Sequence, residues 1–247
     1  MLTTRSASLS MPTVALKGLV VFPGMSINFD VGREKSIAAL KAAMTENQEV
    51  FLVTQKDIRE NDPDYDKLYK VGTIAKINHI LRIPNSDNIR VSVEGIRRAK
   101  LCSVLLQNNY LVCEIKPKND SAIKSEEHEF AQALVRKAKD LFEEYSEFAP
   151  QMPPDVILNV LECRDAGKIA DYIAGNIMLE YPDRQKILNE FNPVTRLEKM
   201  CYRLAKEGDL LKLEAEIGEK VQEQIDKGQR EYYLHEQLKI ISQELNE

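Results

Sequence analysis

The sequence predicts an α+β protein in which a mostly antiparallel β-domain with one or two helices precedes an all-α helical bundle that ends in a long helix. Two observations predict this class. Residues 12–117 contain short runs rich in β-branched or alternating apolar residues, separated by turn residues. From residue 125 onward, apolar residues recur three or four positions apart, which is the spacing of one helix face. Strands followed by helices are typical of an α+β arrangement.

The first part of the chain is expected to form a small barrel or sandwich. Its predicted strands are VALKGLVVF, EVFLVTQ, GTIAKINHILRI, NIRVSVEG, AKLCSVLL and YLVCEIK. Turns are expected at Pro23-Gly24, at residues 84–88, at Glu94-Gly95 and at Asn108-Asn109. One helix interrupts the strands, over residues 33–46, where apolar positions follow helical spacing.

A polar linker at residues 116–120 leads into the predicted bundle. Ser125 is expected to cap its first helix, and Asp165 a later one. Pro182 and Pro193 each stand where proline is tolerated, in the first turn of a helix. Tight proline-marked connections between short helices predict a closely packed helical bundle.

From about Pro193 the helical spacing of apolar residues hardly stops before residue 247. So long a stretch predicts a coiled coil or a projecting connector. Gly218 and Gly228 are expected bend points, because glycine weakens a helix. The alternative is two helices that pack back onto the bundle. The apolar residues expected to serve assembly near the end are Tyr232, Leu234, Leu238, Ile241 and Leu245.

Four segments are therefore expected. Residues 1–11 form a disordered lead-in, 12–118 the β-domain, 119–204 the bundle and 205–247 the long helix. The β-domain segment, counted over residues 1–118, holds 17 Lys and Arg against 12 Asp and Glu, and the remainder holds 17 against 27. Opposite charges on the two parts indicate two structural units with different neighbours.

The composition also indicates the compartment. The first residues lack an apolar signal region, and the longest apolar run is too short to span a bilayer. Without an export signal, the four widely spaced cysteines are expected to be reduced and buried. We therefore expect a cytoplasmic protein.

Motifs for chemistry are missing from the sequence. None of the ten glycines fits the phosphate-binding loop, and no Gly-x-Ser-x-Gly elbow occurs. The three histidines are isolated from one another and from the cysteines, so no zinc site is expected. A serine–lysine nucleophile pair remains open, since its partners would meet only in the fold. We expect an adaptor without catalytic, cofactor-binding or metal-binding residues.

Apolar turns are the candidate binding surface. Phe22, Pro23 and Met25 surround one Pro-Gly turn, and Ile83 and Pro84 stand at a predicted hairpin tip. Exposed apolar tips can hold unfolded chains, so these five residues are the predicted substrate contacts. The alternative interpretation is that they are ordinary core and turn residues. The basic residues 97, 98 and 100 are expected to form a solvated strand edge rather than a nucleic-acid contact.

Several segments together resemble one family. ALKGLVVFPGM (15–25) followed by FDVGREKSIAAL (29–40) resembles the start of the bacterial Lon ATP-dependent proteases. Later matches to the same family are LYKVGTIAKI (68–77), VEGIRRAKL (93–101), GKIADYIAGNIML (167–179), NPVTRLEKM (192–200) and REYYLHEQLKIISQEL (230–245). The segments occur in the family's order from residue 12 to residue 247.

The resemblance implies a small pseudo-barrel similar to the PUA fold, then a helical bundle, then a helix that leads toward an ATPase ring. It implies that this chain stops within that connector helix, before the ATPase module that would hold ATP and Mg and before the serine–lysine protease domain. The implied role is to recruit unfolded or tagged protein substrates and to help six subunits assemble, with no catalysis by this chain.

Two other functions remain open. The first is a nucleic-acid-binding PUA-like module, which the net positive charge of the β-domain favours and which predicts steep salt dependence. The second is a pure oligomerisation scaffold, in which the long helix self-associates and the β-domain only packs.

Overall fold

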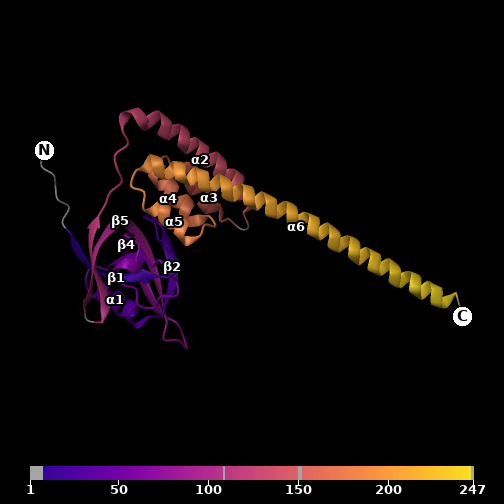
Figure 1. The fold of residues 1–247 in the computed structure, drawn as a ribbon, viewed down its shortest axis with the longest axis horizontal. Helices are drawn as coiled ribbons and strands as arrows, with labels where there is room; N and C mark the ends of the chain where they lie inside the picture. The colour runs from indigo at the N-terminus through magenta and orange to yellow at the C-terminus, as the bar shows by residue number, and fades with distance from the viewer. Residues whose placement is uncertain (1–7, 108, 150–151, 246–247) are drawn as a thin grey trace.

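The structure, a computed structural model, describes residues 8–107, 109–149 and 152–245. A β-domain lies at one end, a group of helices packs on one side of it, and a single long helix projects away from both (Figure 1). The predicted α+β class, with strands first and helices second, is confirmed.

The β-domain is a six-stranded sheet that curls into a barrel. Its strands are β1 (Leu9–Leu16), β2 (Ser26–Val31), β3 (Glu49–Thr54), β4 (Val71–Arg82), β5 (Ile89–Gln107) and β6 (Tyr110–Pro117). They are ordered β2-β5-β4-β3-β1-β6, and a further pairing of β5 with β6 closes the barrel. Every pairing is antiparallel except that of β1 with β3. Helix α1 (Glu34–Thr45) belongs to the connection between these two parallel strands.

Strand β1 starts earlier than expected. Residues 9–13 pair with β6, from Leu9 opposite Ile115 to Thr13 opposite Leu111, and the Met11 side chain is buried. The predicted disordered lead-in is therefore wrong for residues 9–11. The small and polar residues that dominate the first eleven positions predict disorder, but pairing with a strand a hundred positions away orders residues 9–11.

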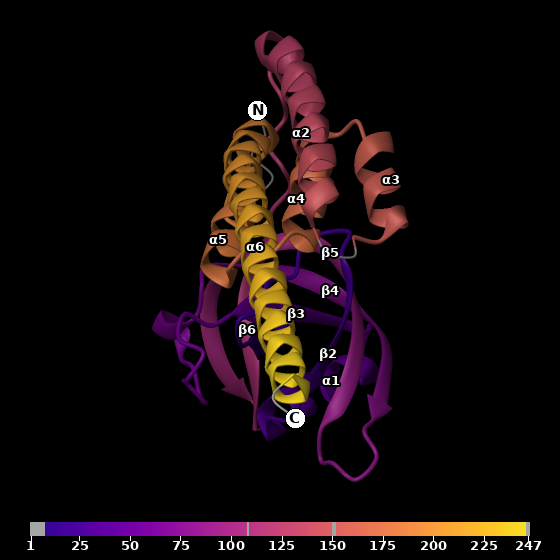
Figure 2. The same ribbon diagram turned by 90° about the vertical axis from the view of Figure 1, so that its right-hand side faces the viewer.

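The second part is a group of five helices. They are α2 (His128–Phe148), α3 (Pro154–Glu162), α4 (Ala166–Asn176), α5 (Tyr181–Leu188) and α6 (Pro193–Glu244). Figure 2 shows the first turns of α6 beside α2, with α3 on the other side of α2 and with α4 and α5 nearer the barrel. Asp165 caps α4 as predicted, accepting a hydrogen bond from the Lys168 amide. Ser125 does not cap α2, because a 3₁₀ turn, η2 (Ser125–Glu127), comes before that helix.

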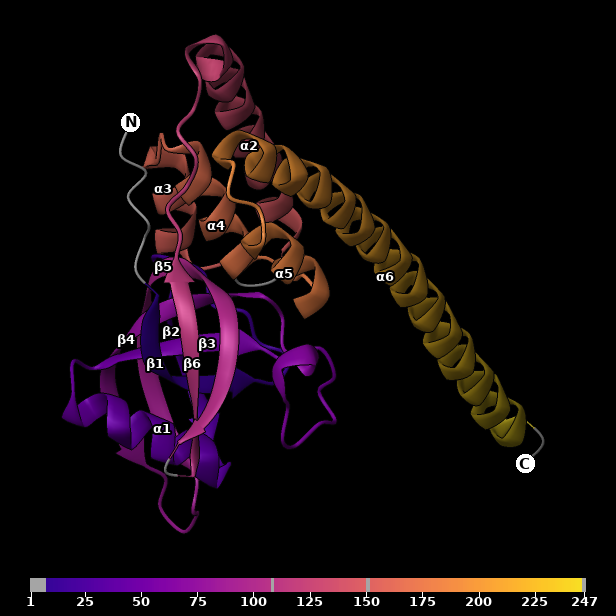
Figure 3. The same ribbon diagram turned by 60° about the vertical axis from the view of Figure 1, so that its left-hand side comes forward.

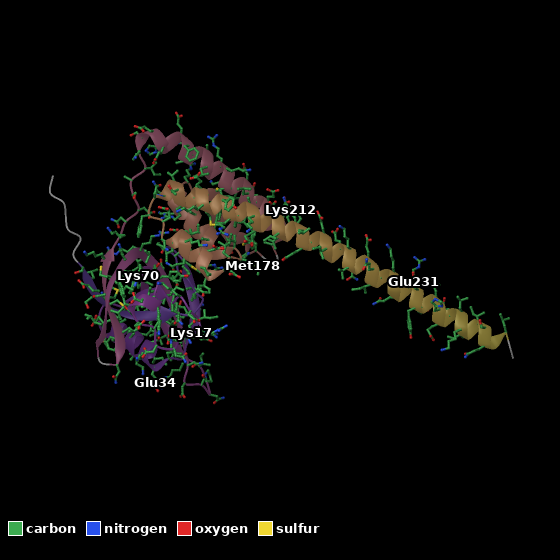
Figure 4. All side chains as sticks on the ribbon, viewed as in Figure 1. Lys17, Glu34, Lys70, Met178, Lys212 and Glu231 are labelled. Atoms are coloured by element: carbon green, nitrogen blue, oxygen red, sulfur yellow. The ribbon has the colours of Figure 1, made fainter. Side chains whose placement is uncertain are left out.

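Helix α6 is one continuous helix of 52 residues. The side chain of Asn192 caps its start, and its first turns are buried in the bundle through residues such as Leu197 and Leu204. In Figure 4, Lys212 lies where α6 leaves the bundle, and Glu231 lies far out on the projecting part. The alternative of two helices packed back onto the bundle is wrong. The helix begins at Pro193, before the expected boundary at residue 205, and it continues through Gly218 and Gly228.

Candidate functional site

A cleft of about 750 Å³ lies between the β-domain and the bundle. One wall consists of the Pro23-Gly24 turn and residues 94–98 of β5. The other consists of the linker residues 118–120, the end of α3 and the first half of α4. We call this the inter-domain cleft. Its volume is that of a typical ligand site.

The floor of the cleft is a buried ion pair. The Arg98 Nη1 atom of β5 donates to Asp171 Oδ2 of α4 over 2.8 Å, and Arg98 Nη2 donates to Asp171 Oδ1. Only 3% of the Arg98 side chain and 6% of the Asp171 side chain are exposed. Burial raises the pKa of the Asp171 carboxyl, and the Arg98 hydrogen bonds and charge limit that rise.

The predicted solvated edge at residues 97, 98 and 100 is therefore wrong for Arg98. Arg97 and Lys100 are exposed, as expected. Arg98 points instead toward the bundle, where the Leu188 carbonyl oxygen accepts its Nε hydrogen. A buried guanidinium requires paired acceptors, and these come from helices that the local strand pattern does not reveal.

A second pair completes the network. Arg196 of α6 donates to both carboxylate oxygens of the linker residue Asp120, over 2.9 and 2.5 Å. Arg196 Nε also lies 3.2 Å from Asp171 Oδ1. Gly167 makes this approach possible, because a Cβ atom there would lie 2.4 Å from Arg196 Nη2. The four charged residues thus join strand β5, the linker, α4 and α6.

The β-domain wall is held by close backbone contacts. The Gly24 amide donates to the Gly95 carbonyl oxygen over 2.7 Å, and the Gly95 amide donates to the Met25 carbonyl oxygen over 2.9 Å. A Cβ atom at Gly95 would stand 2.1 Å from the Phe22 carbonyl oxygen, so this position requires glycine. Residue 95 thus lies within β5 and not in the turn that the sequence predicted.

A β-bulge follows immediately. Gly95 pairs with Ala75 and Arg97 with Ile74, which leaves Ile96 as the additional residue. Its side chain is 43% exposed and lines the cleft. A glycine inside a strand pattern is a signal for a bulge, and it could have predicted the exposure of Ile96.

The predicted substrate contacts divide into two groups. Pro23 is half-buried and lines the cleft, and Met25 is half-buried and packs against the bundle core. Phe22 is fully buried, so its prediction as an exposed contact is wrong. The bundle covers the face of this segment that would otherwise meet solvent, and Phe22 therefore joins the bundle core.

The second predicted tip lies elsewhere. Pro84 is exposed and Ile83 is half-buried in the connection between β4 and β5. Figure 3 shows this hairpin extending from the end of the barrel that faces away from the bundle. The structure therefore does not bring the two predicted tips together.

Sequence reasoning missed the residues on the helical side of the cleft. Tyr172 and Lys168 project from α4, and Lys118 belongs to the linker. The Asn159 side chain of α3 donates to the Tyr172 hydroxyl over 2.8 Å and so positions the ring. Their role depends on how the two parts pack, for which the sequence carries no local signal.

Four of the predicted assembly residues lie on the projecting part of α6, and Leu245 is the residue at its C-terminal cap. All five side chains, from Tyr232 to Leu245, are about half exposed or more. Within the described residues there is no group of three or more metal-binding side chains. None of the described helices combines the length and apolar character needed to cross a membrane.

Comparison with known proteins gives a consistent result. Residues 10–206 match the family described as the ATP-dependent protease La (LON) substrate-binding domain. The chain is 38% identical over 243 residues to the Lon protease of Brevibacillus choshinensis, which covers 98% of this chain and 31% of that protein. It is 39% identical over 237 residues to the Lon protease of Syntrophomonas wolfei, which covers 96% and 29%.

Two solved structures share the fold. The N-terminal domain of Mycobacterium avium complex Lon protease has a TM-score of 0.66 at 20% identity and covers 80% of this chain and 98% of that one. The Lon N-terminal domain protein from Xanthomonas campestris has a TM-score of 0.51 at 18% identity and covers 78% and 96%. The chain spans about a third of the length of the curated relatives it matches.

Proposed function

The chain belongs to the family of Lon substrate-binding domains, and from this premise we propose that it captures unfolded or tagged polypeptides for an ATP-dependent serine protease. The observation that carries the proposal is the inter-domain cleft. The exposed Ile96 side chain lines this cleft together with Pro23 and Tyr172, between two parts that the buried Arg98–Asp171 pair joins. Exposed apolar side chains in a concave site are typical of surfaces that bind other chains.

The long helix supports the assembly part of the proposal. Beyond residue 212 every described side chain of α6 except that of Glu236 is well exposed, and apolar residues recur along it. Such a helix is stabilised by association with other helices. We propose that it joins copies of the chain, as six subunits in the complete protease. Linked copies would raise the effective concentration of several weak sites.

The remaining functional assignments are also proposals. The chain itself is non-catalytic and binds neither metal nor cofactor, and ATP and Mg would act in an ATPase module. It works in the cytoplasm. The absence of phosphate-loop and nucleophile-elbow motifs from its sequence supports the assignment of ATP binding and catalysis to other modules.

Fluorescence anisotropy with a labelled unfolded polypeptide and its folded form tests the proposal. The unfolded form should bind more tightly, with little effect of salt. Ile96→Ser should weaken binding several-fold, whereas Ile83→Ser at the distant hairpin should leave it unchanged. Equal binding of folded and unfolded forms would contradict substrate capture. Loss of binding only in Ile83→Ser would place the contact at the hairpin.

A further inference from the structure

We propose that the inter-domain cleft prefers one class of polypeptide segment, in which an apolar side chain is flanked by carboxylates. This inference rests on the proposed function, since it names the substrate class of the same cleft. It depends on the charges that line the cleft and on which of them are already paired.

Three cations at the cleft have no ion-pair partner among the described residues. Arg97 comes from β5, Lys118 from the linker and Lys168 from the first turn of α4. All three are exposed, and no carboxylate of the described chain lies within ion-pair distance of their charged groups. They are therefore available to an incoming chain.

The other charges at the cleft largely cancel. Asp171 is paired with Arg98, and Asp120 is paired with Arg196. Glu94 is the remaining carboxylate of the lining, against the three free cations Arg97, Lys118 and Lys168. The cleft thus presents a surplus of positive charge, although the chain as a whole carries a net charge of −5. Such local complementarity selects partners more than it adds affinity.

Each wall of the cleft carries an apolar or aromatic side chain on the same element as a free cation, Ile96 with Arg97 on β5 and Tyr172 with Lys168 on α4. The bulge in β5 directs Ile96 outward, immediately before Arg97. Across the cleft, the Asn159 hydrogen bond fixes the Tyr172 ring, in the same helix as Lys168. An apolar anchor flanked by cations from both walls is complementary to a segment with an apolar centre and acidic flanks.

Three short labelled peptides test the proposal by fluorescence anisotropy. They share one apolar centre and differ only in their flanks, which are Glu, Gln or Lys. An exposed ion pair contributes a factor of about two in affinity, so three should favour the Glu peptide about eightfold over the Gln peptide at low salt. The triple variant Arg97→Glu, Lys118→Glu, Lys168→Glu should reverse the order and favour the Lys peptide.

A matched control changes the net charge equally at a distance. Lys41, Lys76 and Lys206 are exposed, have no ion pair among the described residues and do not line the cleft. Their triple replacement by Glu should keep the preference for the Glu peptide. An identical loss of preference in both triple variants would overturn the proposal, because the effect would come from net charge. Circular dichroism confirms that both variants fold.

Other outcomes separate this inference from the proposed function. If the three peptides bind equally and Ile96→Ser weakens all of them, the site is correct and the acidic class is wrong. If unfolded polypeptide does not bind the unaltered chain, the proposed function itself fails. Single-stranded RNA is the last probe. If it binds, if the triple Glu variant of the cleft abolishes this binding and if Ile96→Ser leaves it unchanged, the occupant of the cleft is a nucleic acid.

Discussion

Arg98 and Asp171, 73 positions apart in the sequence, form a buried pair with two hydrogen bonds that fastens the β-domain to the bundle. Asp171→Asn should destabilise the whole chain by about 3 kcal/mol, because it leaves two guanidinium groups buried against one remaining carboxylate. Urea unfolding followed by circular dichroism measures this change. The expected loss comes from an unpaired guanidinium charge, and it is large because that charge is buried.

An exposed pair provides the control. Arg90 and Asp30 join β5 to β2 through two hydrogen bonds, but both side chains are about half exposed. Asp30→Asn should therefore barely change the urea midpoint. The double variant Arg98→Met, Asp171→Leu should recover part of the stability that Asp171→Asn loses. If it recovers none, the loss does not come from an unpaired charge.

Substitution of Phe22 should change stability, whereas substitution of Ile96 should change binding. Phe22 has no exposed surface, so Phe22→Ala should lower the free energy of unfolding by about 3–5 kcal/mol. Ile96→Ser changes a side chain that is 43% exposed and should leave stability within about 0.5 kcal/mol. Thermal unfolding of both variants, with anisotropy against unfolded polypeptide, checks the pair. A stable Phe22→Ala chain with weakened binding would restore Phe22 as a contact.

Local patterns predicted most of the elements but not how the two parts meet. Alternating residues place the strands, helical spacing places the helices, and Asp165 caps its helix as expected. Such patterns could not predict the burial of Phe22, because the sequence of a strand does not show that a helical bundle covers its second face. Arg98 illustrates the same limit, since its partner lies on a helix far along the chain.

Only the β-domain wall of the cleft could be predicted from the sequence, and then only in part. Pro23 was found because a Pro-Gly turn with apolar neighbours is a local signal. Tyr172 and Lys168 lie within a helix of ordinary composition and become part of a site only when α4 packs beside β5. The role of Ile96 could be predicted in part. The glycine before it indicates the bulge, but it does not indicate the cleft that the bulge faces.

Gly218 and Gly228 should limit the stability of the projecting helix. A Cβ atom at either position would meet nothing within 4 Å, so alanine fits without strain. Each Gly→Ala change should stabilise the local helix by about 1 kcal/mol, since glycine has more backbone freedom to lose. Hydrogen exchange of the amides around residue 228 should slow about fivefold, while the urea midpoint of the whole chain stays constant.

Gly95→Ala provides the contrast within the β-domain. Its added Cβ atom would clash with the Phe22 backbone, so this variant should unfold at lower urea. Unchanged exchange around residue 228 in the Gly228→Ala variant would mean that partners, and not helix propensity, determine the stability of this segment.

Leu238 and Ile241 should hold copies of the chain together. Both side chains are more than half exposed on the projecting helix. The unaltered chain should sediment faster as its concentration rises, and Leu238→Lys with Ile241→Lys should remain monomeric, because charge disrupts an apolar helix seam. Gln237→Lys, at an exposed polar position of the same helix, should still associate. A chain that stays monomeric at every concentration would exclude self-association through α6.

Cys113 and Cys201 should make the fold sensitive to alkaline pH. Burial raises the pKa of each thiol from 9.0 to about 11. Between these values the unfolded chain loses the thiol protons and the folded chain keeps them, so the unfolded state gains in stability as pH rises. The free energy of unfolding should therefore fall from about pH 9 and level off above about pH 11, by about 3 kcal/mol for each thiol.

Other groups also titrate in this range, so the thiol contribution is isolated by comparison with Cys113→Ala, Cys201→Ala. This double variant should have a smaller free energy of unfolding at neutral pH, because alanine is smaller than the buried cysteine that it replaces. Its decline between pH 9 and 11 should nevertheless be shallower than that of the unaltered chain, since no buried thiol remains to hold its proton. Parallel slopes in the two urea-unfolding series would mean that the folded thiols ionise as readily as unfolded ones.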